Sequence, residues 1–252
     1  MGVNGRKGPK ANSRTSRDIV QFHIKSEASI QMRKSLFIAL CLAASSFSLS
    51  VNAEAPDPDP GRFNGSIETF AIWDNKNSFP EDAILFVGSS SVRLWSTAMA
   101  FPGKPIINRG FGGSELSDVI HFYDQVVRRY SPRKILLYAG DNDIGNGKSA
   151  DQVFEDYKEL VALVKADLPE SELIFISIKP SKLRWEKWPV MVDVNRMVRD
   201  YAAKNPNLDY ADLATPLLDN HGKPKDVFAV DGLHLNEDGY LLWEEALAPF
   251  LD

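Results

Sequence analysis

Five short apolar runs constrain the fold of this 252-residue chain more than any other feature. The runs lie at 83–87, 105–108, 134–139, 172–178 and 208–213. Each is continuously apolar at its centre and is followed by Gly, Asn, Asp or Lys-Pro. Continuous apolarity is expected of strands that are covered on both faces, and such strands are typical of parallel sheets. The sequence therefore predicts a five-stranded, mainly parallel sheet.

The segments between these runs have the apolar spacing of amphipathic helices, with apolar side chains every three or four residues. These segments lie at 116–130, 153–164, 190–201 and 240–250. Ser149 and Gln152 have the spacing of a capping box at the start of the second segment. Alternating strands and helices predict a three-layer α/β/α sandwich with right-handed crossovers, in which ligands bind beyond the carboxyl ends of the strands. We expect Trp73, Trp95 and Trp243 to lie in its core.

Residues 32–53 have the composition of an export signal. Two basic residues, Arg33 and Lys34, precede an apolar run, and small residues precede Glu54, which is the order found in a secretory signal peptide. The apolar run is short for a membrane span. We therefore expect cleavage after Ala53, export to the periplasm or the medium, and no integral membrane association afterwards. The alternative is a buried or membrane-anchoring helix.

Composition also sets the other boundaries of the chain. Residues 1–31 are polar, basic and aperiodic, and we interpret them as a misassigned or disordered N-terminal extension. Residues 54–62 are rich in Pro and Asp, which is typical of an exposed linker. No second linker follows, so residues 63–252 are expected to form one domain.

The charge and the cysteine content of residues 54–252 exclude several classes of function. Residues 1–53 contain 8 Lys/Arg and 2 Asp/Glu, so the remainder has 29 − 8 = 21 positive and 34 − 2 = 32 negative side chains, a net charge of about −11. This charge argues against nucleic acid or an anionic membrane as a partner. The single cysteine, Cys41, lies in the predicted signal, so the mature chain has no thiol for a disulfide, a nucleophile or a metal ligand. We predict no metal and no cofactor.

Four polar loops at strand ends or helix starts contain the groups that a serine nucleophile requires. They read GSSS at 88–91, NRGFGG at 108–113, GDND at 140–143 and DGLH at 231–234. A serine hydroxyl needs a base within hydrogen-bond distance and a third group that orients the base, and His234 with Asp231 can supply both. Backbone amides of the glycine cluster and the Asn142 side chain can stabilise an oxyanion.

Each loop taken alone has an ordinary alternative. GSSS is more often a turn or a helix cap, and the Asp–His pair could be a structural hydrogen bond at the last helix. The glycine cluster could be a plain tight turn, since it lacks the lysine of a phosphate loop and the spacing of a dinucleotide fingerprint. DND could be a cation-binding cluster, although no EF-hand spacing follows. The four loops in this order are more specific than any one of them.

The ordered set resembles the SGNH/GDSL hydrolase family over about residues 84–236. The resemblance implies a flavodoxin-like SGNH hydrolase fold and a catalytic triad of Ser90, Asp231 and His234. It also implies an oxyanion hole formed by the backbone of Ser90, by Gly113 and by Asn142.

Two positions depart from the family's pattern. The usual Gly-Asp-Ser is Gly88-Ser89-Ser90 here, so the nucleophile is assigned by its spacing from Gly88, and Ser91 is the next candidate. The usual Gly-Gly-Asn-Asp is GDND at 140–143, which places the extra carboxylate of Asp141 near the oxyanion loop. We expect that carboxylate to point outward, because it would oppose a developing negative charge.

The loop SIKPSKLRWEKWP at 177–189 combines basic and aromatic side chains in an acidic chain. We predict that Arg184 and Trp185 contact the substrate, and the alternative is that the tryptophans pack on the next helix, as expected for Trp188. The resemblance and the predicted export favour an esterase for small-molecule or glycan esters with short acyl groups such as acetyl, or for lysophospholipid-type esters. The alternatives are a glycan O-acyltransferase and a non-catalytic carbohydrate-binding module on the same fold.

Overall fold

Five strands form one sheet with the order β2-β1-β3-β4-β5, and every neighbouring pair is parallel. The strands are β1 (Ile84–Gly88), β2 (Ile106–Gly110), β3 (Lys134–Tyr138), β4 (Glu172–Ile176) and β5 (Leu208–Ala211). Their register aligns Gly88 with both Gly110 and Tyr138, so β1, β2 and β3 end at the same level. The predicted parallel sheet is confirmed, and its aligned strand ends bring three of the polar loops to one edge.

The computed structural model describes residues 1–2 and 54–252. The predicted extension at 1–31 (apart from its first two residues) and the predicted signal peptide at 32–53 lie outside the described residues. Residues 54–252 form a compact unit with its own core. Among the described residues, no helix is both long enough and apolar enough to span a membrane.

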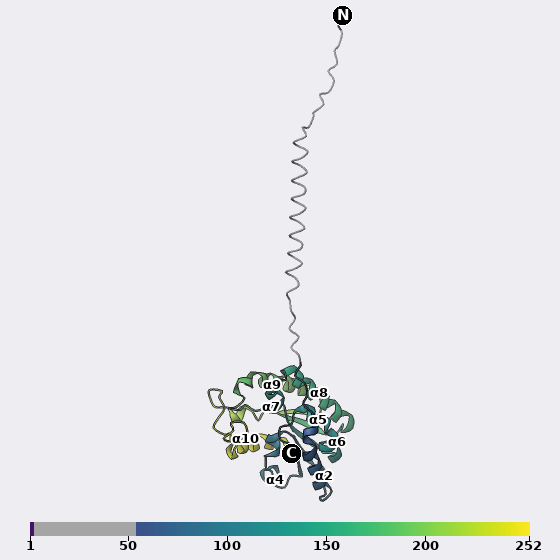
Figure 1. Ribbon diagram of the computed structural model, residues 1–252, viewed down its shortest axis with the longest axis vertical. Helices are drawn as coiled ribbons and strands as arrows, with labels where there is room; N and C mark the ends of the chain where they lie inside the picture. Colours follow the sequence, from purple (N-terminus) through teal and green to yellow (C-terminus); the bar gives the residue numbers. More distant parts are fainter. Residues whose placement is uncertain (3–53) are drawn as a thin grey trace. The chain divides into compact units, whose positions relative to one another are not determined.

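Helices cover both faces of the sheet (Figure 1). The α-helices are α2 (Asn64–Asp74), α3 (Ser90–Arg93), α4 (Thr97–Ala100), α5 (Leu116–His121), α6 (Tyr123–Val126), α7 (Asp141–Gly145), α8 (Ala150–Asp167), α9 (Trp188–Ala202) and α10 (Glu237–Leu247). The 3-10 helices are η2 (Pro60–Phe63), η3 (Arg128–Tyr130), η4 (Trp185–Lys187), η5 (Thr215–Leu217) and η6 (Ala248–Phe250).

Alternate side chains of each strand enter two separate cores, as the pleat of a strand requires. In β1, Leu85 and Val87 pack into the core formed with α5, α8 and α9, whereas Ile84 and Phe86 pack into the core formed with α10. The predicted three-layer sandwich is therefore confirmed.

The predicted helix at 116–130 is divided into α5, α6 and η3, because the backbone leaves helical dihedral angles at Phe122 and Val127. The predicted capping box at α8 is confirmed: Gln152 N–H donates to Ser149 Oγ at 3.2 Å, and Ser149 N–H donates to Gln152 Oε1 at 3.1 Å.

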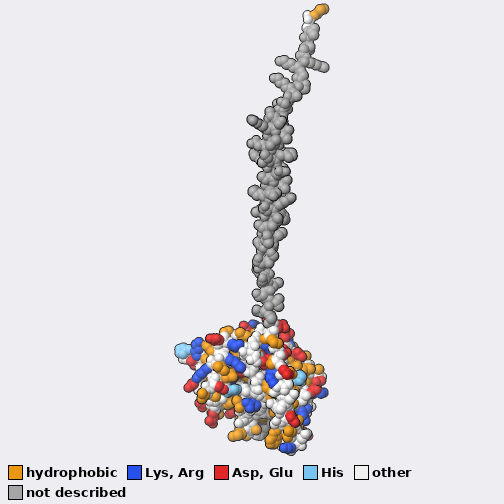
Figure 2. Space-filling model, in the orientation of Figure 1, with side chains coloured by type: hydrophobic (Ala, Val, Ile, Leu, Met, Phe, Trp, Pro, Cys, Tyr) orange, Lys and Arg blue, Asp and Glu red, His pale blue; other side chains and the backbone are white. Residues whose placement is uncertain are grey.

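Two of the three tryptophans predicted to lie in the core do so, and the third does not. Trp95 and Trp243 are buried, but Trp73 is 58% exposed. At this end of α2 the residue that faces the protein interior is Asp74, which is buried and forms an ion pair with Arg109. Acidic, basic and apolar side chains are interspersed on the face of residues 54–252 seen in Figure 2.

Candidate active site

The GSSS loop begins at Gly88, the last residue of β1, and the backbone conformation of this glycine allows the chain to turn there. Gly88 has a φ of +132°, and a Cβ at this position would lie 1.8 Å from the carbonyl oxygen of Tyr138. Only glycine therefore allows the end of β1 to lie this close to β3 while the chain turns. The turn leads directly into the single-turn helix α3, whose first residue is Ser90.

Ser90, His234 and Asp231 form a continuous hydrogen-bonded line. His234 Nε2 lies 2.8 Å from Ser90 Oγ, and His234 Nδ1 lies 2.6 Å from Asp231 Oδ2. Since an ionised carboxylate only accepts hydrogen bonds, Nδ1 carries the imidazole proton and Nε2 is free to accept from the serine hydroxyl. This is the orientation in which an imidazole can act as a base toward Ser90.

The Asp231 carboxylate is held by three donors in one tight turn. Besides the His234 ring, the backbone N–H groups of Leu233 and His234 donate to Oδ1 at 2.9 and 3.0 Å. The hydrogen bond from the His234 ring, followed by the two backbone bonds, lowers the pKa of Asp231 to about 2. The carboxylate is therefore ionised at neutral pH, as an orienting group for His234 must be.

The other two serines of the loop are placed differently from Ser90. Ser89 and Ser91 are buried, and neither hydroxyl has a hydrogen-bond partner within the described part of the chain. Ser90 is half-buried and is bonded to His234. The geometry thus favours the middle serine, the one predicted from its spacing after Gly88.

Asn142 lies in the first turn of α7, beside the glycine loop. Its Nδ2 donates to the carbonyl oxygen of Ser114 at 3.0 Å, and its Oδ1 accepts from Arg184 Nη2 at 3.0 Å. These two contacts orient the amide, so one N–H of Nδ2 remains for a further acceptor. Gly113, next to Ser114, has a φ of +89°, and a Cβ there would meet no atom within 4 Å. The predicted amide and glycine donors are therefore neighbours beside open space.

The predicted substrate contacts of the 177–189 loop are already engaged with the protein. Arg184 Nη1 donates to the carbonyl oxygen of Asp141 at 2.7 Å, in addition to the Nη2 bond with Asn142. The Trp185 ring stacks on Trp188, with centroids 6.2 Å apart, and the Lys223 ammonium lies 4.9 Å from the Trp185 centroid. The prediction that Arg184 and Trp185 contact substrate remains a prediction.

The expectation that Asp141 points outward is wrong. Its side chain is buried, with Lys179 Nζ at 3.3 Å and Arg184 Nη1 at 3.4 Å from Oδ2. Two cations neutralise the carboxylate, so it can lie inside without facing solvent. Lys179 is itself buried, and burial lowers the pKa of its ammonium while Asp141 opposes that effect.

Lys179 is one of the basic residues of the 177–189 loop, but its burial against Asp141 is not predicted from the sequence. The only local signal for it is a lysine directly after the apolar run of β4, where it could equally have been solvated. Within the described residues, no group of three or more His, Cys, Asp or Glu side chains has an arrangement that could hold a metal ion.

Comparison with known proteins shows similarity of this chain to lipases and acylhydrolases. Residues 89–242 match the GDSL-like Lipase/Acylhydrolase family. A search of curated proteins found no match.

Solved structures are similar to this chain over most of its length. One, from Streptococcus pneumonia and named after platelet activating factor, has a TM-score of 0.68 and 23% identity and covers 76% of this chain and 94% of its own. A GDSL-like lipase from Bacteroides thetaiotaomicron has a TM-score of 0.64 and 20% identity, with coverages of 73% and 96%. A catalytic mutant of an acetylxylan esterase from Geobacillus stearothermophilus has a TM-score of 0.56 and 15% identity, with coverages of 68% and 94%. At these identities the likeness shows a shared fold.

Proposed function

Since this chain belongs to the GDSL-like lipase/acylhydrolase family, we propose that it is an exported serine esterase that cleaves carboxylic esters through an acyl-enzyme. The observation that carries the proposal is the line of hydrogen bonds from Ser90 Oγ through the His234 ring to Asp231, at 2.8 and 2.6 Å. A serine hydroxyl becomes a competent nucleophile when an oriented imidazole can take its proton.

The proposed reaction has two steps, acylation of Ser90 and hydrolysis of the acyl-enzyme. Ser90 Oγ bonds to the ester carbonyl carbon while His234 Nε2 takes the hydroxyl proton, and the tetrahedral adduct collapses when the alcohol leaves with that proton. Water then attacks the acyl-enzyme, again giving a proton to His234, and Ser90 leaves with this proton as the acid is released. Asp231 stays ionised throughout and stabilises the imidazolium in both halves.

The oxyanion of each adduct requires donors that are already in place. The remaining N–H of Asn142 Nδ2, the backbone N–H of Gly113 and the backbone N–H of Ser90 take this role. The hydrogen bonds from Asn142 to Ser114 and from Arg184 to Asn142 support it, because they orient the amide before substrate binds. Such a preorganised donor is worth about 3 kcal/mol of barrier.

We assign short acyl groups, such as acetyl on a glycan, as the substrate class, ahead of lysophospholipid-type esters. The similarity in fold to an acetylxylan esterase supports this choice. The signal-like segment at 32–53 also supports this choice, because an exported enzyme would encounter polymeric glycans outside the cytoplasm. Trp185, in the 177–189 loop, and Lys223, whose ammonium lies 4.9 Å from the Trp185 ring centroid, are the proposed contacts for the glycan.

The test is hydrolysis of p-nitrophenyl esters of increasing chain length by purified residues 54–252. We expect kcat/KM to be highest for acetate, and Ser90→Ala and His234→Ala each to lower kcat by about 10³-fold or more. Ser91→Ala is the matched control and should retain activity. Full activity in Ser90→Ala with loss in Ser91→Ala would move the nucleophile, and absence of turnover by the wild type would reject the enzyme in favour of a binding module. Diversion of acetyl to an added sugar would identify a transferase.

A further inference from the structure

We propose that Lys148 is a positioning residue for the oxyanion hole, because its buried ammonium holds together the two loops that carry Gly113 and Asn142. This inference rests on the proposed function, which gives those loops their catalytic role. Lys148 lies in the turn between α7 and α8, is 4% exposed, and is absent from the residues that the sequence pointed to.

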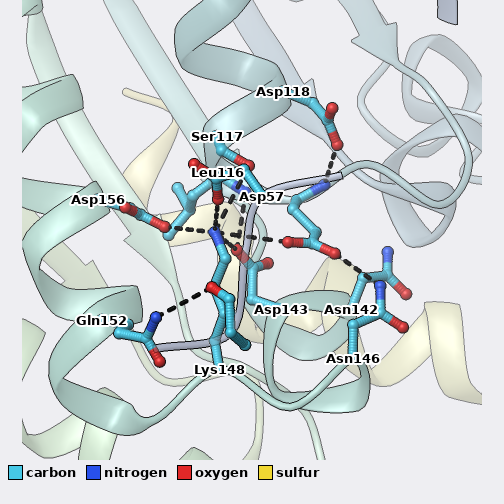
Figure 3. Close-up of polar contacts among 12 residues, drawn as sticks. Asp57, Leu116, Ser117, Asp118, Asn142, Asp143, Asn146, Lys148, Gln152 and Asp156 are labelled. Atoms are coloured by element: carbon cyan, nitrogen blue, oxygen red, sulfur yellow. Dashed lines mark hydrogen bonds and ion pairs between the residues drawn. The ribbon is translucent and has the colours of Figure 1, made fainter. Parts of the chain in front are cut away.

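Four carboxylates and one hydroxyl surround the Lys148 ammonium (Figure 3), and three of these five groups lie more than 30 residues from Lys148 in the sequence. The Nζ distances are 2.6 Å to Asp57, 2.7 Å to Asp156, 3.4 Å to Glu115, 3.6 Å to Asp143 and 3.5 Å to Ser117 Oγ. The carboxylates fall into an inner pair, Glu115 and Asp143, which are 1% and 0% exposed, and an outer pair, Asp57 and Asp156.

The inner pair connects the loop that carries Gly113 with the loop that carries Asn142, which we call the oxyanion loops. Each of the two carboxylates accepts a hydrogen bond from the other loop. Asp143, which directly follows Asn142, accepts a hydrogen bond from the backbone N–H of Leu116 at 3.0 Å. Glu115, two residues after Gly113, accepts one from Asn146 Nδ2 at the end of α7, at 2.6 Å. Each loop thus donates a hydrogen bond to a carboxylate of the other.

A third bond joins the same loops at the catalytic edge, from Asn142 Nδ2 to the carbonyl oxygen of Ser114. The separation between the Gly113 backbone and the Asn142 amide is therefore set by three cross-loop hydrogen bonds. Two of the three use carboxylate acceptors, and hydrogen bonds to ionised acceptors are the stronger kind. Loss of charge on Glu115 or Asp143 would loosen the connection.

Lys148 supplies the positive charge beside these two buried acceptors, at 3.4 Å from Glu115 and 3.6 Å from Asp143. Burial raises the pKa of Asp143 to about 7, and the Lys148 charge opposes that rise. For Lys148 itself, burial would lower the pKa, but the contacts with Asp156, Asp57 and Asp143 outweigh burial and raise it. Without the ammonium, two adjacent buried carboxylates would face each other with no counter-charge, which proteins avoid by protonation or rearrangement.

Asp156, in the outer pair, offers a matched control, because it contacts the same ammonium but neither oxyanion loop. Asp156 lies on α8 and is 22% exposed, and Asp57 lies in the segment before η2 and is 60% exposed. Removing one of them takes a partner from Lys148 and leaves all three cross-loop bonds in place. A purely structural role for the cluster would change the Tm of a folded variant and leave its kcat unaltered.

The experiment compares Lys148→Met with Asp156→Asn in the purified protein, using p-nitrophenyl acetate. We expect Lys148→Met to lower kcat about 10- to 100-fold with KM within about twofold of wild type, because the donors act on the transition state more than on the bound ester. Asp156→Asn should stay within about threefold in kcat. Both are assayed well below their Tm, which is measured for each variant.

Three outcomes would overturn the proposal: unchanged kcat in folded Lys148→Met, an equal loss in Asp156→Asn, or a change in KM alone. If Lys148→Met fails to fold, Glu115→Gln replaces it. This variant keeps the size and the acceptor oxygen but removes the charge, and we expect a fall in kcat of about fivefold or more at unchanged KM.

A second readout separates this inference from the proposed function. Hydrogen exchange of the Leu116 amide should be faster in Lys148→Met than in wild type or Asp156→Asn, whatever reaction the site catalyses. A wild-type protein without esterase activity would reject the proposed function while leaving the exchange test intact. Unchanged Leu116 exchange would reject the cross-loop role of Lys148 even in an active esterase.

Discussion

At the residue scale, Arg184 determines which end of the Asn142 amide faces the proposed oxyanion. The guanidinium donates to Oδ1, so the NH₂ end is directed toward Ser114. We predict that Arg184→Met lowers kcat about 10- to 100-fold with little change in KM, since the amide loses its orienting donor. Steady-state kinetics on p-nitrophenyl acetate measure both constants. Arg184→Lys, which keeps the charge but not the planar fork, should recover only part of the loss.

The same variant tests the sequence-based prediction that Arg184 binds substrate. A substrate contact would raise KM and leave kcat for small esters near the wild-type value, so the two roles give opposite kinetic patterns. A rise in KM for acetylated oligosaccharides alone, with unchanged kinetics on p-nitrophenyl acetate, would favour substrate binding over positioning.

Asp231 makes a pH-dependent contribution to stability whose direction follows from its lowered pKa. Its hydrogen bonds lower that pKa from 3.8 to about 2, so the folded state favours the ionised form. The contribution is complete above about pH 4 and is lost as the pH falls toward 2. We predict that the difference in urea midpoint between wild type and Asp231→Asn shrinks over this interval. Glu159→Gln, at an exposed position of α8, is the control, and a difference that does not change with pH would contradict the prediction.

The sequence predicts that Ser90 and His234 lie close together. It does not predict the burial of the two lysines nearby, Lys148 and Lys179. Ser90 is placed by its spacing after Gly88, and Asp231 and His234 share one turn, so local sequence carries both signals. Lys148 and Lys179 resemble solvated lysines in sequence. Their burial depends on carboxylates from other elements, such as Asp57 and Asp141. The expectation that Asp141 points outward was wrong because Lys179, which neutralises its charge, lies in the loop after β4 and not near it in the sequence.

At the element scale, the strands were predictable because a strand covered on both faces is apolar along its whole length. Residues 83–87 became β1 with a shift of one residue. The helix predicted at 116–130 was only partly right. An apolar stripe reports which side chains face the core, and Leu116, Val119 and Val126 do so. It does not show whether the helical backbone continues past His121, where α5 ends.

The capping box of α8 should contribute to stability without affecting the proposed chemistry. Ser149 Oγ accepts from Gln152 N–H, and the reciprocal bond is present. We predict that Ser149→Ala lowers the free energy of unfolding by about 1 kcal/mol, because one N–H of the first turn loses its acceptor. Urea unfolding measures the change, and kcat on p-nitrophenyl acetate should be unaltered. An unchanged midpoint would show that water replaces the cap without cost.

At the scale of the whole molecule, the segment before η2 is anchored to the body of the fold by two contacts. Asp57 pairs with Lys148 at 2.6 Å, and the carbonyl oxygen of Ala55 accepts from Gln152 Nε2 at 3.1 Å. The segment was predicted as an exposed linker from its Pro and Asp content. Most of its side chains are exposed, but composition could not reveal its contacts with Lys148 and with Gln152 of α8. The cleavage after Ala53 that the sequence predicts would leave both contacts in place, whereas a chain beginning beyond Asp57 would lack them.

We predict that the exported protein begins at Glu54, so that processing leaves both anchoring contacts in place. Intact-mass measurement and N-terminal sequencing of the secreted or periplasmic product test this, and Ala53→Asp, which removes the small residue before the cleavage site, should block processing. A variant beginning at Asp59 would lack Ala55 and Asp57, and we expect a lower Tm with kcat within about threefold of wild type, because neither contact reaches the oxyanion loops directly. A product that retains residues 32–53, or one that begins beyond Asp57 with an unchanged Tm, would contradict this account.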